Sequence, residues 1–487
     1  MNRATTDTDV LIVGAGPVGL FLAHECARRA LRCRLIETRS GQSEHSKALA
    51  IFPRTLEVFD MAGVVAPFLE VANRVTSVAV IARQRSLARL RFEPEGTPYP
   101  FVGMVPQDVT EKILAQEIRQ KSGGVEYDTT FVSAVQHDGH VTATLDRKGE
   151  RIEVTALFLV GCDGAHSAVR HLLDLSFEGA QYAASFMLAD VETNEVLPGD
   201  ELHLCPSEFG PLAIFPMGAT RRRLVATVDK ADENSPSLAF VQKVVAQRAP
   251  AGFEVLSMRW SSYFRVHHRH VSRMSVGRVF IAGDAAHIHS PFGGQGMNTG
   301  LQDVWNLAWK LDLAVRGRGN KQLLESYSAE RYPVIKGVIE TTHRLTRAMG
   351  TGSKFAQAVR DTVIPLISRT SVFQRRFVQN LSELSIAYAG SPIIDGAGNR
   401  FWGDSLRGGK GIGSLFLLLV GDHANPVTRK AASQFCASFS DLIELRYLPQ
   451  RGVMLVRPDG YIAYEGEMDK SGAVLESMRS LVKRQTN

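Results

Sequence analysis

Residues 9–37, DVLIVGAGPVGLFLAHECARRALRCRLIE, decide the fold of the first part of the chain. Asp9 to Val13 form a short and almost entirely apolar run, which is typical of a buried parallel strand. A helical pattern extends from Pro17 to about Ala30, and a second apolar strand, Cys33 to Ile36, ends at Glu37. The stretch therefore predicts a βαβ unit.

The turn between this strand and helix carries glycines at the spacing of a dinucleotide-binding loop, GAGPVG. Gly14 permits a tight turn, Gly16 lets the backbone approach a pyrophosphate, and Gly19 lets the helix pack closely on the strand. The helix N-terminus offers unpaired N–H groups and a partial positive charge to a phosphate. Glu37 stands where its carboxylate can accept hydrogen bonds from a ribose diol. Together these features predict dinucleotide binding rather than a simple tight turn.

Two further glycine–aspartate turns follow strands later in the chain. VGCDGAHSAVR, residues 160–170, comes after an apolar strand, and taken alone it is compatible with an ordinary turn. GRVFIAGDAAHIHSPFGGQGMNTGLQDVWNLAWKL, residues 277–311, places Asp284 at the carboxyl end of a strand, where α/β folds bind ligands. The glycines at 293, 294 and 296 permit close approach of a flat ligand. The helix that begins near Met297 or Asn298 can stabilise the negative charge of a reduced flavin.

Length and composition exclude several classes of protein. A chain of 487 residues favours two or three domains, and 44% hydrophobic with 22% charged residues is ordinary for a globular protein. The net charge of +6 comes without a basic arm, which argues against nucleic-acid binding. The five cysteines form no CxxC pair, and the polar N-terminus and short apolar runs resemble neither a secretory signal nor a membrane span. We therefore expect a reducing, cytoplasmic location.

The order of the three motifs resembles the group A FAD-dependent aromatic hydroxylases, which share the para-hydroxybenzoate hydroxylase fold. The nearest likeness, over almost the whole chain, is to the polyketide, phenol and phenylpropionate hydroxylases with a thioredoxin-like C-terminal domain. The resemblance implies an α/β fold with three parts: a Rossmann-like FAD-binding domain with a helical extension (1–75, 100–176 and 275–390), an inserted β-sheet substrate domain (76–99 and 177–274) and a thioredoxin-like domain (391–487). The last part contains LVRPDGYIAY but no CxxC, so we expect a structural or dimer-supporting role for it.

The resemblance also assigns residues to FAD. It implies that Glu37 holds the adenosine ribose, that Lys47 and Gln107 contact the phosphates and the ribityl region, and that Asp163 serves FAD placement and nicotinamide access. The full cofactor-binding set is Gly14, Ala15, Gly16, Pro17, Gly19, Glu37, Lys47, Gln107, Asp163, Gly164, Gly283, Asp284, Pro291, Gly294, Gln295, Gly296, Met297 and Asn298. Lys47 departs from the arginine usual in the family; lysine keeps the charge but loses the bidentate fork.

The implied reaction is hydroxylation of a phenolic or polyketide ring with NADPH or NADH and O2, through a flavin C4a-hydroperoxide. FAD carries this chemistry, so no catalytic side chain is assigned. His287 and His289, close to Asp284 in the sequence, are candidates for proton transfer or for packing. Strand alternation makes Phe186, Leu202, Leu204, Phe215 and Met217 candidates for the substrate pocket or for ordinary core. The resemblance implies that Pro291 and Gly294 to Asn298 line the flavin ring, and we call residues 291–298 the flavin loop. Phe292 is a further pocket candidate because it lies in this loop.

Other interpretations remain open at this point. A Baeyer–Villiger-type oxygenase, a flavin dehydrogenase and a non-catalytic FAD-bound assembly protein all fit the same motifs. The stretch HHRH, residues 267–270, lacks carboxylate or cysteine ligands at suitable spacing, so a surface or strand-pairing role is expected rather than a metal site. The partners expected are an aromatic small molecule and O2, in a monomer or homodimer.

Overall fold

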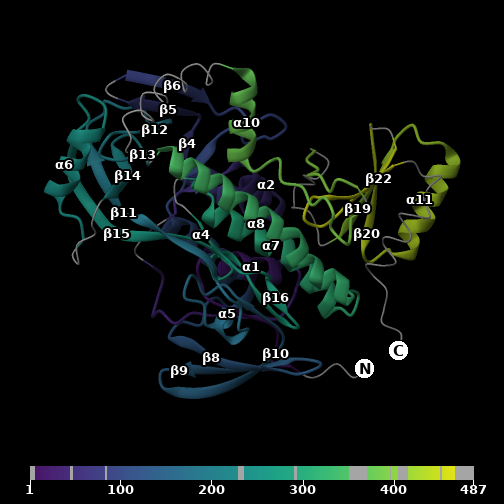
Figure 1. The fold of residues 1–487 in the computed structure, drawn as a ribbon. Helices are drawn as coiled ribbons and strands as arrows, with labels where there is room; N and C mark the ends of the chain where they lie inside the picture. Colours follow the sequence, from purple (N-terminus) through teal and green to yellow (C-terminus); the bar gives the residue numbers. More distant parts are fainter. Residues whose placement is uncertain are drawn as a thin grey trace.

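The computed structural model of the protein describes residues 6–43, 46, 48–82, 85–228, 235–289, 293–349, 370–394, 396–403, 415–449 and 452–466. Figure 1 shows the large mixed sheet at the upper left, β8 to β10 at the bottom, the C-terminal sheet at the right, and α7 and α8 between them. Among the described residues, no helix combines the length and the apolar character needed to cross a membrane.

A seven-stranded sheet forms the base of the molecule, and its parallel part has the order β17-β10-β1-β2. The apolar run near the N-terminus forms β1, which lies at the centre of these strands and is buried along its whole length. The strands of this sheet are β1 (Thr8–Val13), β2 (Cys33–Ile36), β8 (Thr129–Gln136), β9 (Val141–Arg147), β10 (Glu150–Gly161), β16 (Ser275–Val276) and β17 (Val279–Ile281). The predicted βαβ unit is thus confirmed, with β1 and β2 pairing in parallel.

Helices cover this sheet and approach the ends of its parallel strands. α1 packs against both α4 and α7, which are far apart in the sequence. Among the described residues, the helices outside the C-terminal segment are α1 (Pro17–Arg28), α2 (Pro53–Ala62), α3 (Val65–Val71), α4 (Gln107–Ser122), α5 (Ala168–Leu172), α6 (Leu238–Arg248), α7 (Gly296–Val315), α8 (Lys321–Met349) and α10 (Ser371–Ser382), with a short 3-10 turn η1 (Gly283–Ala285). A small sheet of β3 (Ala50–Ile51), β7 (Val102–Met104) and β4 (Asn73–Val75) lies near the N-terminus of α7.

An eight-stranded sheet has the order β18-β15-β11-β14-β13-β12-β5-β6. Its strands are β5 (Ser77–Ala82), β6 (Arg85–Arg91), β11 (Glu178–Thr193), β12 (Glu201–Cys205), β13 (Leu212–Pro216), β14 (Arg221–Val228), β15 (Val255–His270) and β18 (His287–Ile288). Strands from both sequence segments predicted for the substrate region therefore lie in one sheet. One face packs under α6 through residues such as Met187, Ile214 and Val241, which leaves the other face toward the rest of the molecule.

The C-terminal segment forms a four-stranded sheet, β20-β19-β21-β22, with one helix. β19 (Phe416–Gly421), α11 (Pro426–Ser438) and β20 (Ile443–Leu448) make a parallel βαβ unit, and β21 (Val453–Val456) and β22 (Ile462–Gly466) add an antiparallel hairpin. The side chains of Trp309 and Leu313 on α7 and of Leu323 on α8 belong to the same apolar cluster as this sheet. The segment is therefore packed directly on the helix that begins at the glycine-rich loop.

Candidate FAD site and substrate face

The three glycine-containing turns converge at one edge of the seven-stranded sheet, because each follows a neighbouring parallel strand. Backbone hydrogen bonds join them: Gly14 N–H donates to the Ile36 carbonyl at 2.9 Å, Cys162 N–H to Val13 at 2.7 Å, and Ala282 N–H to Gly161 at 2.9 Å. The carboxyl ends of parallel strands are where open α/β sheets bind ligands. Turns separated by more than a hundred residues thus form one continuous edge.

The three glycines of the first turn have three different surroundings. Gly14 has a φ of +99°, and a Cβ there would lie 2.5 Å from the Cys162 carbonyl oxygen. A Cβ on Gly19 would lie 1.9 Å from the Gly14 carbonyl oxygen, so the helix packs too closely for any side chain. A Cβ on Gly16 would meet no described atom within 4 Å. Space is therefore left only at Gly16, beside the N-terminus of α1, as a pyrophosphate requires.

Glu37 lies at the end of β2 and faces this turn. Its Oε2 accepts from the Ala15 N–H at 2.8 Å, and its Oε1 accepts from the Arg39 N–H and side chain, both at 3.0 Å. Burial alone would raise the pKa of the carboxyl, but the hydrogen bonds from Arg39 and Ala15 outweigh it and the pKa is lowered. An ionised acceptor is therefore fixed beside the glycine turn.

Gln107 occupies the first position of α4 and lies against Ser46 and Ala48, which precede β3. Its backbone N–H donates to the Ser46 hydroxyl at 2.8 Å, and its Oε1 accepts from the Ala48 N–H at 3.2 Å. Arg223 reaches from the eight-stranded sheet to the Ala48 carbonyl at 3.1 Å while it pairs with Asp190. This segment therefore links α4 to the eight-stranded sheet. Lys47, predicted to contact FAD here, lies outside the described residues.

The carboxylate of Asp163 is directed at α5. Its Oδ1 accepts from the Ser167 hydroxyl at 2.6 Å and its Oδ2 from the Val169 N–H at 3.1 Å. Burial raises the pKa of Asp163 in spite of these hydrogen bonds. Gly164 has a φ of +77°, and a Cβ on it would meet no described atom within 4 Å. The Asp163 side chain thus shapes the turn, and open space lies beside Gly164.

The turn after β17 is held from beneath by α7. Gly283 has a φ of +60°, its N–H donates to the Asp303 Oδ2 at 3.1 Å, and it lies so close to Gly300 that a Cβ on Gly300 would be 2.9 Å from the Gly283 Cα. Asp284, which follows, is exposed. This carboxylate, which the family resemblance assigns to FAD, is therefore exposed at the turn that α7 supports.

The glycine-rich loop before α7 is fixed to β3, a segment some 250 residues earlier. The Asn298 Oδ1 accepts from the Phe52 N–H at 2.9 Å, and its Nδ2 donates to the Ala50 carbonyl at 2.9 Å. Gly294 has a φ of +63°, and a Cβ on it would contact Ala50 and Phe52 at 3.5 and 3.6 Å. The Asn298 amide is thus occupied by the protein, so its contribution to FAD would come from its backbone. Pro291 and Phe292 lie outside the described residues.

The comparisons with known proteins agree with this geometry. The FAD binding domain family matches residues 7–342. The chain belongs to the FAD-dependent monooxygenases. It is 36% identical to 6-methylpretetramide 4-monooxygenase of Streptomyces rimosus over 408 residues, 80% of this chain and 72% of that one. It is 30% identical to pentachlorophenol 4-monooxygenase of Sphingobium chlorophenolicum, covering 74% of this chain and 69% of that one.

Among solved structures, the anhydrotetracycline hydroxylase OxyS of Streptomyces rimosus superposes with a TM-score of 0.79 at 28% identity. The superposition covers 98% of this chain and 99% of that one. The resemblance inferred from the three motifs is therefore confirmed, and it extends over the C-terminal segment as well.

In this monooxygenase, His287 is a buried structural group. Its Nε2 lies 2.7 Å from the Asp303 Oδ2, and the other oxygen of Asp303 accepts from Arg331 at 2.8 Å. Burial opposes ionisation of Asp303, but His287 and Arg331 outweigh it and lower its pKa. His287 is 1% exposed, so this position favours support of the Gly283 turn over proton transfer to a substrate. His289 stacks parallel to His287, 6.3 Å away, and lies near Gly296.

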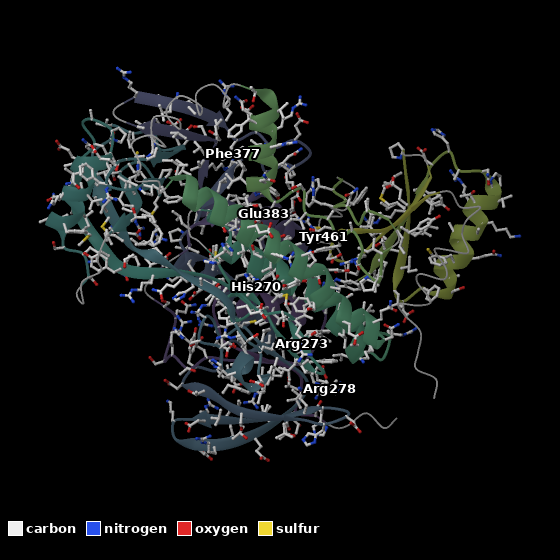
Figure 2. The ribbon with its side chains drawn as sticks, viewed as in Figure 1. His270, Arg273, Arg278, Phe377, Glu383 and Tyr461 are labelled. Atoms are coloured by element: carbon white, nitrogen blue, oxygen red, sulfur yellow. The ribbon has the colours of Figure 1, made fainter. Side chains whose placement is uncertain are left out.

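The substrate candidates share the face of the eight-stranded sheet opposite α6. Phe186 and Leu204 belong to one apolar cluster with Phe264, and Leu202 and Met217 belong to another with Phe52; Phe215 contacts both clusters. Because Phe52 also lies against Gly294, the second cluster adjoins the flavin loop. Phe377 and Leu381 of α10, which were not among the predicted pocket residues, pack onto the same cluster. Phe377 is labelled in Figure 2.

The residues of HHRH lie on β15, where His270 pairs with Glu178 and His268 with Ala180 of β11. Among the residues that the structure covers, no group of three or more His, Cys, Asp or Glu side chains is arranged to hold a metal ion.

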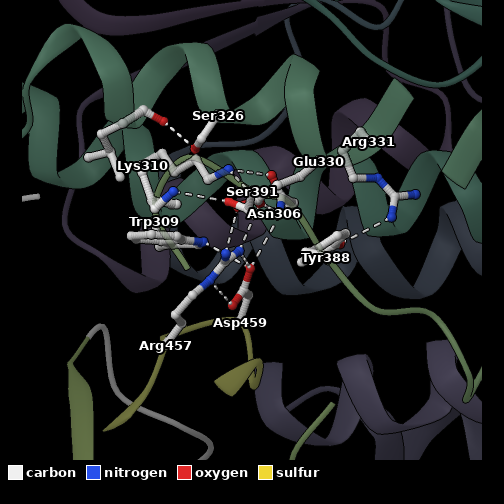
Figure 3. A network of polar contacts seen from close by, with 12 residues as sticks. Asn306, Trp309, Lys310, Ser326, Glu330, Arg331, Tyr388, Ser391, Arg457 and Asp459 are labelled. Atoms are coloured by element: carbon white, nitrogen blue, oxygen red, sulfur yellow. Dashed lines mark hydrogen bonds and ion pairs between the residues drawn. The ribbon is translucent and has the colours of Figure 1, made fainter. Parts of the chain in front are cut away.

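A buried polar network joins the C-terminal segment to α7 and α8 (Figure 3). Arg457 donates to both oxygens of Glu330 and also to Asp459, and the Lys310 Nζ donates to Glu330 at 2.8 Å. Trp309 Nε1 donates to Asp459 at 3.2 Å. The side chains of these residues are almost completely buried, and burial lowers the pKa of Lys310 to about 8 despite the charge of Glu330. The sequence signal was a row of polar residues at helical spacing in the apolar helix α7, namely Gln302, Asp303, Asn306 and Lys310.

Proposed function

We propose that this monooxygenase hydroxylates an aromatic substrate of the phenolic or polyketide class, using NADPH or NADH and O2. The observation that carries the proposal is the adjacency of the flavin loop and an apolar face: Phe52 contacts Gly294 on one side and clusters with Leu202, Phe215 and Met217 on the other. A ring held on this face would lie next to the loop that the family resemblance assigns to the flavin. Reacting atoms about 3–3.5 Å apart are needed for efficient transfer.

The residues at the sheet edge fit FAD. The pyrophosphate would lie against the turn formed by Gly14, Ala15, Gly16, Pro17 and Gly19. Among the three glycines of this turn, Gly16 is the one with open space beside its Cα, so the phosphates would approach the backbone there. Glu37 would accept from the ribose, Asp284 and Gln107 would bind the ribityl and phosphate region together with Lys47, and Gly294 to Met297 with the Asn298 backbone would face the ring. When bound, FAD supplies the redox chemistry, taking reducing equivalents from NAD(P)H and activating O2; the oxygen-transfer route implied by the resemblance is part of the proposal.

The protein's own contribution is position, charge and exclusion of water. The N-terminus of α7 points its unpaired N–H groups at the loop, so it favours negative charge there. The apolar cluster around Phe52 would exclude water from the oxygen-transfer step. Asp163 would act indirectly, by shaping the turn that ends at Gly164.

The finer domain assignment is part of the proposal. The seven-stranded sheet with its helices would be the FAD-binding domain, and the eight-stranded sheet the substrate domain. The parallel βαβ unit and hairpin after residue 415 support a thioredoxin-like C-terminal domain. The only cysteine of this segment, Cys436, cannot form a dithiol pair, which favours a structural role for the segment. The monomer or homodimer and the cytoplasmic location expected from the sequence also remain part of the proposal.

The names of the similar proteins support the substrate class. One is a monooxygenase of 6-methylpretetramide, another of pentachlorophenol, and the similar solved structure is an anhydrotetracycline hydroxylase. The greater identity to the first favours a fused polycyclic ring over a simple phenol.

A substrate screen tests the function. Purified holoprotein is supplied with NADPH or NADH, a panel of phenols and polycyclic aromatics is added, and reductant consumption is followed together with the mass and NMR spectrum of products. Stimulated consumption with one hydroxyl added to a ring is expected. An oxygen inserted beside a carbonyl indicates a Baeyer–Villiger oxygenase, loss of two hydrogens indicates a dehydrogenase, and no stimulation across the panel contradicts the proposal.

A further inference from the structure

Glu383 terminates α10 in an unusual conformation. It has a φ of +60° and a ψ of 12°, the left-handed region in which residues with a Cβ are uncommon. Its side chain is nevertheless 3% exposed, and Figure 2 labels it near the centre of the molecule, between Phe377 and Tyr461. A charged residue type in a disfavoured backbone conformation at a helix end normally projects into water. Its burial therefore needs a specific partner.

That partner is Gln302 on α7. The Gln302 Nε2 donates to the Glu383 Oε2 at 2.5 Å, and Gln302 is itself 2% exposed. In the part of the chain that the structure describes, the remaining oxygen of each side chain, Glu383 Oε1 and Gln302 Oε1, has no hydrogen-bond partner. Two buried acceptors without donors are destabilising, because each has lost its water.

A single proton satisfies both oxygens. If Glu383 Oε1 carries it, this atom becomes a donor and Gln302 Oε1 is the acceptor on the side chain that already faces it. Glu383 Oε2 continues to accept from Gln302 Nε2, so the two side chains close a ring of two hydrogen bonds. We propose that Glu383 is kept as a neutral carboxylic acid that is hydrogen-bonded to the Gln302 amide. This proton-dependent pair would position the first turns of α7 beside the flavin loop.

The Glu383–Gln302 pair lies close to the start of α7, where it can affect the flavin loop. Gln302 lies seven residues, about two turns, beyond Gln295, so the two side chains emerge on the same face of α7. The Gln295 Nε2 donates to the Asn380 carbonyl of α10 at 3.2 Å. The C-terminal end of α10 is therefore attached to α7 at two points, and one of them, Gln295, is a residue of the flavin loop itself.

The surrounding charges do not supply the missing donor. Arg331 from α8 and Arg54 from α2 are the cations that favour ionised Glu383, but Arg331 is paired with Asp303 and Arg54 with Glu57. Burial is the largest effect and raises the pKa of Glu383 from 4.5 to about 8, against the side-chain hydrogen bonds from Gln302 and Gln295 and the charges of Arg331 and Arg54. Because the folded-state pKa is the higher one, the stability contributed by the proton is complete below about pH 4.5 and is lost as pH rises through about 8.

The first test is infrared spectroscopy of the wild-type holoprotein in water and heavy water, without substrate. We expect a carbonyl stretch of a protonated carboxylic acid at neutral pH, shifted in heavy water and lost above the pKa of about 8. The band should be missing in E383Q, whose amide preserves both hydrogen bonds without a titratable proton. Absence of the band in the wild type at neutral pH overturns the proposal, and this outcome needs no variant that folds.

The second test compares E383Q with the wild type and with E325Q, in which an exposed carboxylate of α8 is removed. From about pH 6 to about pH 9, which brackets the value of about 8, the unfolding midpoint and the FAD affinity of the wild type should fall relative to E383Q. E325Q should follow the wild type. If the unfolding midpoints of the wild type and E383Q depend on pH in the same way, Glu383 does not carry the proposed proton. If the midpoints differ but the FAD affinities do not, the pair does not position the flavin loop.

The FAD readout rests on the proposed placement of FAD against residues 294–298. Infrared and unfolding measurements need neither substrate nor turnover. Failure of the aromatic substrate screen would therefore leave both measurements intact, and the two proposals fail separately.

Discussion

Arg457 forms a bidentate ion pair with Glu330, with Nη1 to Oε1 at 2.6 Å and Nη2 to Oε2 at 2.9 Å, although the two residues are 127 positions apart. The pair is completely enclosed, and Lys310 and Asp459 complete its coordination. Because α7 carries Lys310 near one end and begins at the flavin loop at the other, the C-terminal segment is held by the same helix that borders the proposed FAD site.

Replacing Arg457 with Met should lower the free energy of unfolding by about 3–5 kcal/mol, because it leaves Glu330 and Asp459 buried near a single compensating lysine. Urea or thermal denaturation of the holoprotein measures this change. K430A, which alters an exposed cation on α11 in the same segment, should change the unfolding free energy by less than about 0.5 kcal/mol. Equal stability of R457M and K430A would contradict the account of the network.

The glycines of the first turn should respond differently to alanine. G16A should fold with nearly wild-type stability, since the added methyl meets no described atom within 4 Å, but it should bind FAD at least about tenfold more weakly, since the methyl occupies the space left for the pyrophosphate. G19A should lose roughly 1–3 kcal/mol of stability or more, because its Cβ would lie 1.9 Å from a backbone oxygen. Flavin titration and thermal unfolding of both variants separate the two effects. If G16A binds FAD as tightly as the wild type, the pyrophosphate does not lie beside Gly16.

Glu37 should contribute to FAD affinity as an ion. We expect E37A to weaken FAD binding by about 10- to 100-fold, the equivalent of about 1.5–3 kcal/mol for hydrogen bonds to a charged acceptor. Since the folded-state pKa is lowered from 4.5, the contribution of ionised Glu37 should be complete above about pH 4.5 and be lost as pH falls below it. Calorimetric titration with FAD across this range checks the sign. A loss of affinity toward high pH that E37Q abolishes would be the opposite of this expectation.

The two faces of the eight-stranded sheet should differ in their effect on turnover. F215A opens the face next to the flavin loop, so water should reach the site and more reductant should be consumed per product formed. F240A removes an aromatic ring from the α6 side and should reduce stability while leaving the ratio of product to NAD(P)H consumed unchanged. Product quantification beside hydrogen peroxide release measures the ratio. If F240A uncouples the reaction as strongly as F215A, the substrate does not lie on the predicted face.

Local patterns allowed much of this architecture to be predicted. The apolar run of β1, the glycine spacing after it and Glu37 each depend on residues close in sequence, and the structure arranges them as expected. The relation among Gly14, Cys162 and Gly283 was predicted only through the family resemblance, because strand order is a long-range property.

Pairings across long separations could not be read from the sequence. Asn298 stays a predicted flavin contact, and its amide is bound by backbone groups of Ala50 and Phe52. Asp163 stays a predicted FAD contact, and its carboxylate accepts from Ser167 and Val169 at the start of α5. Arg457 and Glu330 look like surface residues in any local window, and only the packing of the C-terminal segment on α7 buries them.

A crystal structure of the holoprotein with FAD tests the central claim most directly. The account predicts the pyrophosphate beside Gly16, the adenosine ribose within hydrogen-bond distance of Glu37 and the flavin ring against residues 294–298. FAD bound at any other edge of the seven-stranded sheet, or a Gly16 turn that contacts no phosphate, would contradict it.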